Sequence, residues 1–480
     1  MAETVVDFLS FSDTASNPVK ELGGFRDREW KRALPWLHDA GLALYLLQKL
    51  KDTDATDVLP TSELCRLEGN LAANRRRLAL LARQFEVLNH RLNRAGVRYA
   101  VVKGFSLVPA FCPDASLRHQ SDLDYLVDDQ SLPLAKTVLE DAGYCLQKSK
   151  TNEFVFLMPS AGMPLSADGQ YEAASPYAVE LRRAFWDTDI HGVCWAEPKF
   201  SVDSARTQYW QELAFPALPE EDAFLIQVVH VFNHILTGWV RMSWLYEMGY
   251  FLNQRSTDAG LWERIAGRRG GDRLLHEMAV VVTGLSGQLF GSPVPSRFAN
   301  WAKELRPSTR IWIQHYASTW MFAKNRVDEF SFFSAAPVVL FFHQQYLPDE
   351  SARRHLMRSR LFPWEQLFRR ARSITANSSR TAGSRGPQLR RLLIRLLFHA
   401  TGGLRFLREI PRWRKLNKSK AAFAGSDNRA VGSSSAESGA ENYCCREPVG
   451  DSERVVTSLR RTDTFSEDRH GAESSSCKKH

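Results

Sequence analysis

Hydrophobic residues recur at helical spacing along the first part of the chain. Residues 27–52 and 62–95 place apolar side chains three and four positions apart, with Asp27 and Ser62 as capping residues at their starts. Gly96 follows the second segment, and glycine commonly ends a helix at this position. We therefore predict an all-helical N-terminal region over residues 1–95.

After Gly96 the pattern becomes that of a mixed α/β unit. Residues rich in β-branched and aromatic side chains, or alternating between polar and apolar, are typical of strands. Such segments are residues 97–102, 122–127, 153–157 and 177–181. A short helix over 105–111 and a helix over 131–142, which Gly143 closes, are predicted between them. We expect a small mixed β-sheet core over residues 96–203.

From about residue 204 onward helical spacing returns. The segments 222–232 and 239–252 are strongly apolar, and further helices are predicted over 260–370, so we assign a C-terminal helical region to residues 204–372. From residue 416 to 480 large apolar side chains are scarce, and such a composition cannot offset the entropy of ordering the chain. The predicted fold class is therefore α+β: a small mixed sheet flanked by helical regions and followed by a disordered tail.

The positive charge is concentrated in one segment. The chain has a formal net charge of +9, but residues 352–420 hold sixteen arginines and three lysines against two glutamates, and the remainder is net acidic. Leucines and arginines at helical spacing over 389–398 and 404–408 predict a basic amphipathic segment, assigned to residues 373–415. Such a helix can bind an anionic membrane surface, dock on the core or bind RNA phosphates. Aromatic stacking residues are sparse there, which disfavours nucleic acid.

Cysteine usage and hydropathy indicate a cytoplasmic protein. The seven cysteines are scattered and form no C-x-x-C pair, as expected for free thiols in a reducing compartment. The N-terminus lacks the pattern of a signal peptide, and the longest apolar run, residues 335–342, is too short to span a bilayer. We expect a cytoplasmic location, with the basic segment as a peripheral membrane contact.

Candidate chemistry is concentrated on the strand predicted over 122–127. Asp122 and Asp124 stand two positions apart, so both carboxylates point to the same face of the strand. Paired carboxylates are ligands that Mg²⁺ prefers, and a third carboxylate on a neighbouring strand, for which Glu180 is the candidate, allows two ions. Lys103-Gly104 lies at a strand-to-helix turn, where glycine permits close backbone approach and a helix N-terminus favours phosphate. There Lys103 can supply a point charge to the phosphates.

These residues also carry a family resemblance. The Lys103-Gly104 turn, Arg118 shortly before Asp122-Leu123-Asp124, the strand end at Val127 and a helix closed by Gly143-Tyr144 resemble the uncharacterised bacterial nucleotidyltransferase family of the DNA polymerase β-like superfamily. The resemblance is strongest over 97–145 and extends over about 27–350. In its helical part, this family often has paired histidines followed by an R-x-x-W-L-x-D/E run. The matching residues here are His230, His234, Arg241, Trp244, Leu245 and Glu247.

The resemblance implies specific roles. Asp122, Asp124 and Glu180 match the catalytic, metal-binding carboxylates, whereas Lys103, Gly104 and Arg118 match the nucleotide-binding positions. The implied activity is Mg²⁺-dependent transfer of a nucleoside monophosphate from a nucleoside triphosphate, expected to be ATP, to a hydroxyl acceptor. Where the family has a histidine two residues after the third carboxylate, this chain has Arg182.

Several alternatives remain open from the sequence. Glu180 is either a ligand or a surface strand residue, and Lys103 is either a phosphate clamp or a charge at a strand end. His230 and His234, one helical turn apart, are interpreted as packing residues because no third ligand is evident. Asp128 and Asp129 are interpreted as turn residues.

The function also has alternatives. A catalytically inactive nucleotide-binding or interaction module with a basic membrane- or RNA-associating segment fits the same pattern. So does an enzyme that modifies a protein or a small sugar, as part of a polysaccharide or defence gene cluster.

Overall fold

The computed structural model describes residues 1–12, 17–158, 171, 177–269, 271–296, 298, 302–322, 337–361 and 385–427. All of them belong to the first of the two units into which the chain divides, residues 1–432. The architecture is α+β, as predicted, with one mixed sheet and helices on both sides of it in the sequence.

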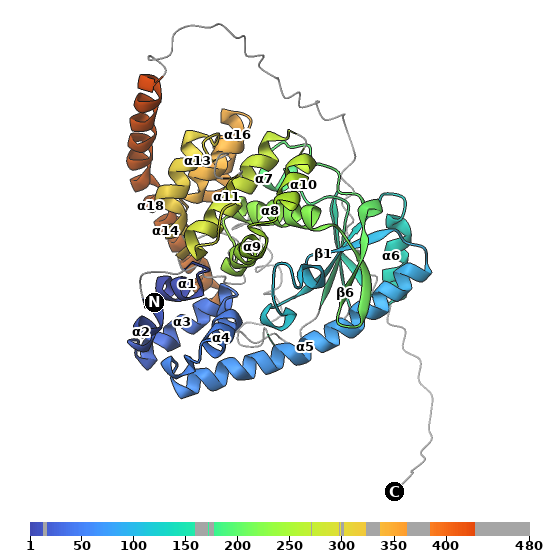
Figure 1. Ribbon diagram of the computed structural model, residues 1–480. Helices are drawn as coiled ribbons and strands as arrows, with labels where there is room; N and C mark the ends of the chain where they lie inside the picture. The colour runs from blue at the N-terminus through green and yellow to red at the C-terminus, as the bar shows by residue number, and fades with distance from the viewer. Residues whose placement is uncertain are drawn as a thin grey trace. The chain divides into compact units, whose positions relative to one another are not determined.

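The N-terminal region is helical, as expected from its apolar spacing. Its helices are α1 (Ala2–Leu9), α2 (Pro18–Gly23), α3 (Asp27–Asp39), α4 (Ala43–Asp52) and α5 (Thr61–Arg94). The segment predicted as helical over 27–52 is divided at Gly41, which has a φ of 73° and lies against the side chain of Ser243. Helix α5 runs from the N-terminal helices to the sheet (Figure 1). The buried leucines along one side of α5 explain how so long a helix is held.

Within the described residues, seven strands form the sheet in the order β3-β4-β5-β2-β1-β7-β6. The strands are β1 (Tyr99–Val102), β2 (Asp122–Val127), β3 (Cys145–Ser149), β4 (Glu153–Leu157), β5 (Ala178–Arg182), β6 (Arg206–Trp210) and β7 (Leu213–Ala217). Strand β2 pairs antiparallel with β1 and parallel with β5. It is therefore a central strand, and its apolar residues are buried on the sheet.

The predicted strands and helices of this core are confirmed, with shifts of a few residues at their ends. Strands β1, β2, β4 and β5 and helix α6 (Leu132–Asp141) are present, and Gly143 follows α6 with a φ of 89°. The predicted helix over 105–111 is shorter, a 3-10 helix over Gly104–Leu107 called η2.

The prediction that residues from 204 onward are helical is wrong at its start. Strands β6 and β7 occupy 206–217, and β7 pairs with β1 in parallel. The sheet therefore extends past the predicted core boundary at 203. The reason is that β6 is largely exposed and β7 contains Pro216, so neither segment shows the apolar alternation of a buried strand.

Helices follow β7 as predicted. They are α8 (Glu220–Thr237), α9 (Met242–Arg255), α10 (Ala259–Arg269), α11 (Arg273–Phe290), α13 (Pro307–Trp312), α14 (Ser318–Phe322), α15 (Val339–His343) and α16 (Glu350–Leu361). The short helix α7 (Thr188–His191), which was not predicted, lies between β5 and β6. Helices α8, α9 and α11 pack on one another beside the sheet (Figure 1). Within the part of the chain that is described, we find no helix of the length and apolar character needed to cross a membrane.

The basic segment contains helix α18 (Arg385–Asp427). Residues 373–384 lie outside the described residues, as do residues 428–480 of the predicted disordered tail. Helix α18 continues past the predicted boundary at 416. Its residues Phe406 and Trp413 are buried, and both rings stack on Phe341 of α15 with centroids 4.5 and 4.9 Å away.

The cysteines among the described residues carry free thiols, as predicted. They are Cys65, Cys112, Cys145 and Cys194.

Candidate metal and nucleotide site

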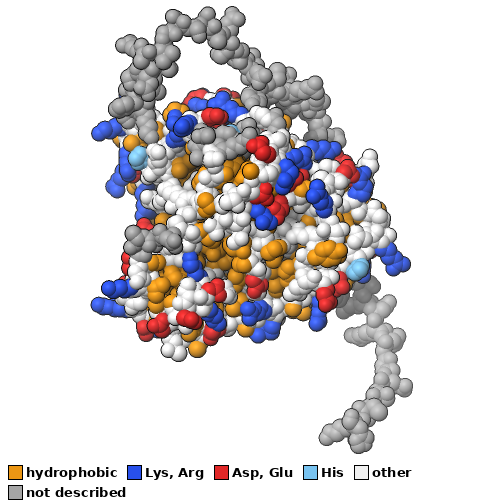
Figure 2. Space-filling model, in the orientation of Figure 1, with side chains coloured by type: hydrophobic (Ala, Val, Ile, Leu, Met, Phe, Trp, Pro, Cys, Tyr) orange, Lys and Arg blue, Asp and Glu red, His pale blue; other side chains and the backbone are white. Residues whose placement is uncertain are grey.

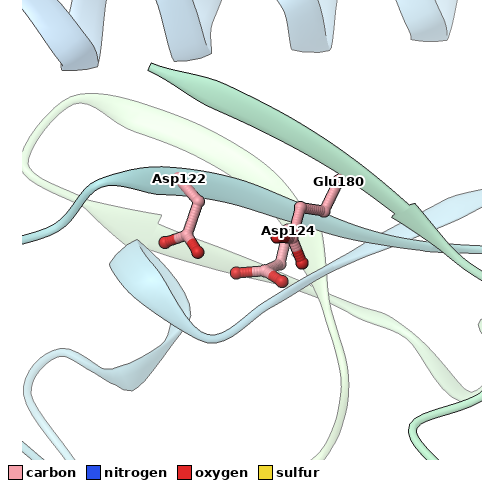
Figure 3. A group of neighbouring side chains, drawn as sticks. All are labelled: Asp122, Asp124 and Glu180. Carbon is pink, nitrogen blue, oxygen red and sulfur yellow. The ribbon is translucent and has the colours of Figure 1, made fainter. Parts of the chain in front are cut away.

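Three carboxylates meet on one face of the sheet. Asp122 and Asp124 project from β2, and Glu180 projects from the adjacent parallel strand β5, where it lies in register with Asp124. One ligand oxygen from each lies within 4.8 Å of the others, and Figure 3 shows the three carboxylates gathered together. The structure thus brings together the three residues that the sequence singled out.

Strand alternation explains this placement. Leu123 and Tyr125 are buried on the opposite face of β2, so the residues between and before them must face the other way. Tyr125 is fully buried and stacks near Phe85 of α5, which fixes the strand against that helix. The apolar face of β2 therefore orients its two aspartates.

Two cations bind the central carboxylate. Lys103 Nζ donates to Asp124 Oδ1 at 2.9 Å, and Arg182 Nε donates to the same oxygen at 3.2 Å. Arg182 also pairs with Glu180 and, at 2.8 Å, with Glu153 of β4. The negative charge of the triad is thus partly balanced by protein cations.

These charges shift the titration of the triad. Burial and the nearby Asp124 raise the pKa of Asp122, and the same two causes raise the pKa of Glu180 to about 7. Burial opposes ionisation of Asp124 as well, but Lys103 and Arg182 outweigh it and hold the pKa of Asp124 below its usual range. Asp124 is therefore the member of the triad that ionises most readily.

The turn between β1 and η2 has an unusual backbone. Lys103 has φ 59° and ψ −161°, and Gly104 has φ 49°, so both lie in the left-handed region. A Cβ on Gly104 would come within 2.4 Å of the Gln120 side chain, and this close approach requires glycine. Gln120 in turn donates to the backbone oxygen of Asp122 at 2.9 Å. The turn is therefore packed directly against the start of β2.

Arg118 lies behind this turn. Its Nε donates to Glu247 of α9 at 2.7 Å, and a terminal nitrogen lies 3.4 Å from the Gly104 oxygen. The Arg118–Glu247 pair is buried, and Tyr45 donates to the same glutamate at 3.0 Å. Arg118 is thus held by the helical region while its side chain reaches the turn.

Helix α8 contributes two histidines near the triad. Burial, assisted by Lys103, lowers the pKa of His234 to about 3 and lowers the pKa of His230 as well, so both rings are neutral near pH 7. Both pack on Trp244, with ring centroids 4.6 and 4.5 Å away. Among the described residues, the triad is the one group of three or more possible ligands close enough to hold a metal ion. The packing interpretation of the two histidines agrees with this geometry.

The two neighbouring aspartates act in turns and surface pairs. Asp128 accepts from the Ser131 backbone N–H at 2.7 Å, and Asp129 pairs with Arg183. Neither belongs to the triad.

Sequence reasoning did not assign roles to Arg182, Gln120 or Arg241. Arg241 is half-buried, its buried Nε has no hydrogen-bond partner among the described residues, and Asp122 is among the groups that act on its charge. Arg182 was visible only as a departure from the family pattern, and its contacts depend on the register between β4 and β5.

The donor set fits a divalent cation of the magnesium type. All three groups are carboxylates, which are hard oxygen ligands. The side chain of Asp122 makes no hydrogen bond or ion pair with the described residues, so both of its oxygens can take a metal ion.

The mixed sheet and its three gathered carboxylates define a candidate divalent-cation site, and comparison of sequences gives the family. A family described as uncharacterised nucleotidyltransferase matches residues 26–287, which is more than half of the chain. The protein belongs to this family. No curated protein matches the chain.

Proposed function

We propose that the protein transfers a nucleoside monophosphate from a nucleoside triphosphate, ATP in the first instance, to a hydroxyl acceptor with the help of Mg²⁺. The observation that carries this proposal is the triad of Asp122, Asp124 and Glu180 within 4.8 Å in a chain of the nucleotidyltransferase family. Magnesium bound there would polarise the phosphates and activate the attacking hydroxyl.

Each residue has a distinct role in this proposal. Asp122 and Asp124 would hold the ions that bind the triphosphate, and Glu180 would be a further ligand for the ion on the acceptor side. The N–H groups at Gly104 contact phosphate, and Arg118 holds the Gly104 turn in place through its contact with the turn's backbone oxygen. Lys103, which binds Asp124 in this structure, would supply a positive charge to the phosphates of a bound nucleotide.

The reaction is a single displacement. The acceptor oxygen forms a bond to the α-phosphorus while the bond from that phosphorus to the bridging oxygen breaks. Pyrophosphate leaves, and the hydroxyl proton passes to the Glu180 carboxylate. Positioning and charge stabilisation by the surrounding groups supply the catalysis.

Calorimetric titration of the full chain with ATP, GTP, CTP and UTP in Mg²⁺ tests this proposal. The double variant Asp122→Asn, Asp124→Asn should weaken nucleotide binding by at least about tenfold, or about 1.4 kcal/mol. The control Asp129→Asn removes one negative charge just beyond β2, where the side chain is 70% exposed, and should bind as the wild type does. Failure of the wild type to bind any nucleotide would refute the proposed enzymatic activity.

A second candidate function has its own supporting observation. Because Lys103 and Arg182 already bind Asp124, the triad is partly neutralised without a metal ion, as in a fold that has kept its structure but lost catalysis. The protein would then be an interaction module. Nucleotide binding that does not depend on Mg²⁺ or on the two aspartates would favour this candidate.

We also propose that α18 contacts an anionic membrane surface from the cytoplasmic side. On α18, Leu393, Leu397, Leu404 and Leu407 are each more than half exposed, which favours a lipid surface over RNA. Figure 2 shows lysine and arginine side chains at the left edge of the view, where Figure 1 draws α18.

A further inference from the structure

A pocket opens beside the triad, on the side of β5. Its volume is about 180 Å³, and its lining includes Lys103 and Arg182, the two cations that bind Asp124. Its other walls come from the β3–β4 hairpin, from the loop after β5 and from α8. The pocket is therefore adjacent to the triad, and Lys103 and Arg182 contact both.

The position of the pocket relates it to the acceptor. In the sheet, β1 and its Gly104 turn lie on one side of β2, whereas β5 and β4 lie on the other. The attacking and leaving oxygens of an in-line displacement lie on opposite sides of the phosphorus. With the triphosphate at the Gly104 turn, the hydroxyl must approach from the Glu180 side, where this pocket lies.

The charges of the pocket favour an anion. Four lysine or arginine side chains and two carboxylates line it. Both carboxylates are already engaged: Lys150 pairs with Asp187 at 3.1 Å, and Glu153 pairs with Lys148 and Arg182. The Lys148 and Lys150 side chains are 47% and 29% exposed, so a ligand can reach them although each is in an ion pair. The basic side chains of the lining outnumber the carboxylates, and a phosphate group would supply the negative charge that balances them.

The wall formed by α8 offers acceptors for hydroxyl groups. Asn233 and His234 line the pocket, and their buried atoms Asn233 Oδ1 and His234 Nδ1 have no hydrogen-bond partner among the described residues. The Asn233 amide nitrogen is held by the Phe185 oxygen at 2.9 Å, which fixes the free oxygen in place. Unpaired buried acceptors of this kind are satisfied by donors on a ligand.

We infer that this pocket binds the acceptor and that the acceptor is a hydroxyl compound carrying a phosphate group, of the sugar phosphate or polyol phosphate class. The inference rests on the proposed nucleotidyl transfer, because that reaction places the acceptor on the Glu180 side. The phosphate binds Lys148 and Lys150, and hydroxyl groups donate to Asn233 and His234.

Binding of inorganic phosphate and glucose 6-phosphate to the full chain tests the inference, with glucose as the uncharged match. Calorimetry should show binding of both anions and at least about tenfold weaker binding of glucose. The variant Ile190→Glu places a negative charge at the pocket on a side chain that is 43% exposed, so the fold should tolerate it. It should weaken anion binding by at least about tenfold relative to the neutral match Ile190→Gln.

A second pair of variants tests the lysines. Lys148→Gln, Lys150→Gln should weaken glucose 6-phosphate binding, whereas Lys20→Gln, Lys31→Gln, which removes the same charge from exposed positions of α2 and α3, should not. Absence of anion binding by the wild type, or binding that ignores Ile190→Glu and the lysine variants, would overturn the inference.

Nucleotide binding separates this inference from the proposed function. The pocket variants should bind Mg-ATP as the wild type does, and if they lose it the pocket holds the triphosphate instead of the acceptor. If the wild type binds glucose 6-phosphate in the pocket but binds no nucleotide, the proposed nucleotidyl transfer is refuted, whereas the assignment of the pocket as an anion site stands.

Discussion

Lys103 adopts a backbone conformation that glycine adopts far more readily than lysine. Its φ of 59° with ψ of −161° places the Cβ against the backbone, yet its ammonium group must reach Asp124 at 2.9 Å. Strained backbone of this kind persists where the surrounding structure fixes it, and it concentrates at functional sites. The lysine side chain at this position therefore strains the backbone, and this strain is a cost to the stability of the fold.

This cost predicts the order of two substitutions. Lys103→Gly and Lys103→Ala both remove the ammonium group, but glycine alone fits the left-handed backbone without strain. We expect the glycine variant to exceed the alanine variant by about 1 kcal/mol in the free energy of unfolding. Urea unfolding of the two proteins measures the difference, and an alanine variant of equal or greater stability would contradict it.

A single residue, Glu197, makes the stability of the folded protein depend on pH. Burial raises the pKa of Glu197 to about 7, against the opposing effect of backbone N–H groups at Trp186 and Phe185 that donate to its Oε2 at 2.8 Å. The folded protein thus holds this proton more tightly than the unfolded chain. Its stabilising effect is complete below pH 4.5 and is lost as pH rises through 7.

The variant Glu197→Gln tests this sign. The amide oxygen can accept the same two N–H groups at all pH values, so the variant should gain stability relative to the wild type between pH 5 and pH 8. The gain should be at most about 3 kcal/mol, from the size of the pKa shift. Urea unfolding at several pH values measures it, and a difference that stays constant with pH would refute the prediction.

The triad could be predicted from the sequence only in part. Asp122 and Asp124 share one strand, so alternation alone places them together. Glu180 required a second strand, and its distance from Asp124 depends on a parallel register that no local pattern encodes. The contacts of Arg182 depend on this parallel register and on the antiparallel register between β4 and β5, so the sequence revealed the residue but not its role.

At the scale of elements, helix α5 holds the segment that enters β2. Asn74 of α5 is buried, and its amide donates to the backbone oxygens of Ser116 and Arg118 at 2.7 and 2.8 Å. Arg77, one turn later, donates to the Gln120 oxygen. The helix therefore positions the loop whose residues support both the Gly104 turn and Asp122.

Asn74→Ala should loosen this support. Two backbone oxygens lose their partner, which costs about 1–3 kcal/mol in the free energy of unfolding. The affinity for Mg-ATP should fall as well, because the loop sets the position of Asp122. Arg83→Ala, on the exposed side of the same helix, is the control for both measurements. A variant that loses stability but binds nucleotide as tightly as the wild type would show that α5 has no influence on the site.

Some strands and helices could be predicted from the sequence and others could not. Strand β2 and helices α5 and α8 carry apolar residues in regular positions, and their bounds were predicted to within a few residues. All five residues of β3 are exposed, so its sequence carries no buried face to detect. Such edge strands form because a neighbouring strand offers backbone hydrogen bonds, which depends on the assembled sheet.

At the scale of the whole molecule, charge and exposed apolar surface coincide on α18. The helix carries a net charge of +9 over residues 385–427, although its opposite face is anchored by the stacking of Phe406 and Trp413 on Phe341. Arg405, Arg408 and Arg412 are exposed beside the leucines. Basic groups near an anionic bilayer contribute about 1 kcal/mol each, and leucines that insert add to this.

Co-sedimentation of the full chain with phosphatidylglycerol vesicles tests the membrane contact. We expect binding that weakens with salt and is absent with phosphatidylcholine alone. Leu404→Glu, Leu407→Glu should reduce binding by at least about tenfold, because two charges enter the face that meets the lipid. Leu80→Glu, Val87→Glu on α5 exchanges two comparably exposed apolar residues away from α18 and should have no effect.

RNA is the competing partner for the same charge. An RNA duplex would be held by arginine and lysine contacts to phosphate, so binding to it would depend on salt but not on the leucines. If the leucine variants keep all binding to vesicles, α18 binds anionic surfaces through its charge alone. If the chain binds RNA and no vesicle, α18 is a nucleic-acid site. If vesicle binding is lost in the leucine variants, α18 holds the protein at the membrane surface, and the acceptor pocket belongs to a membrane-bound protein.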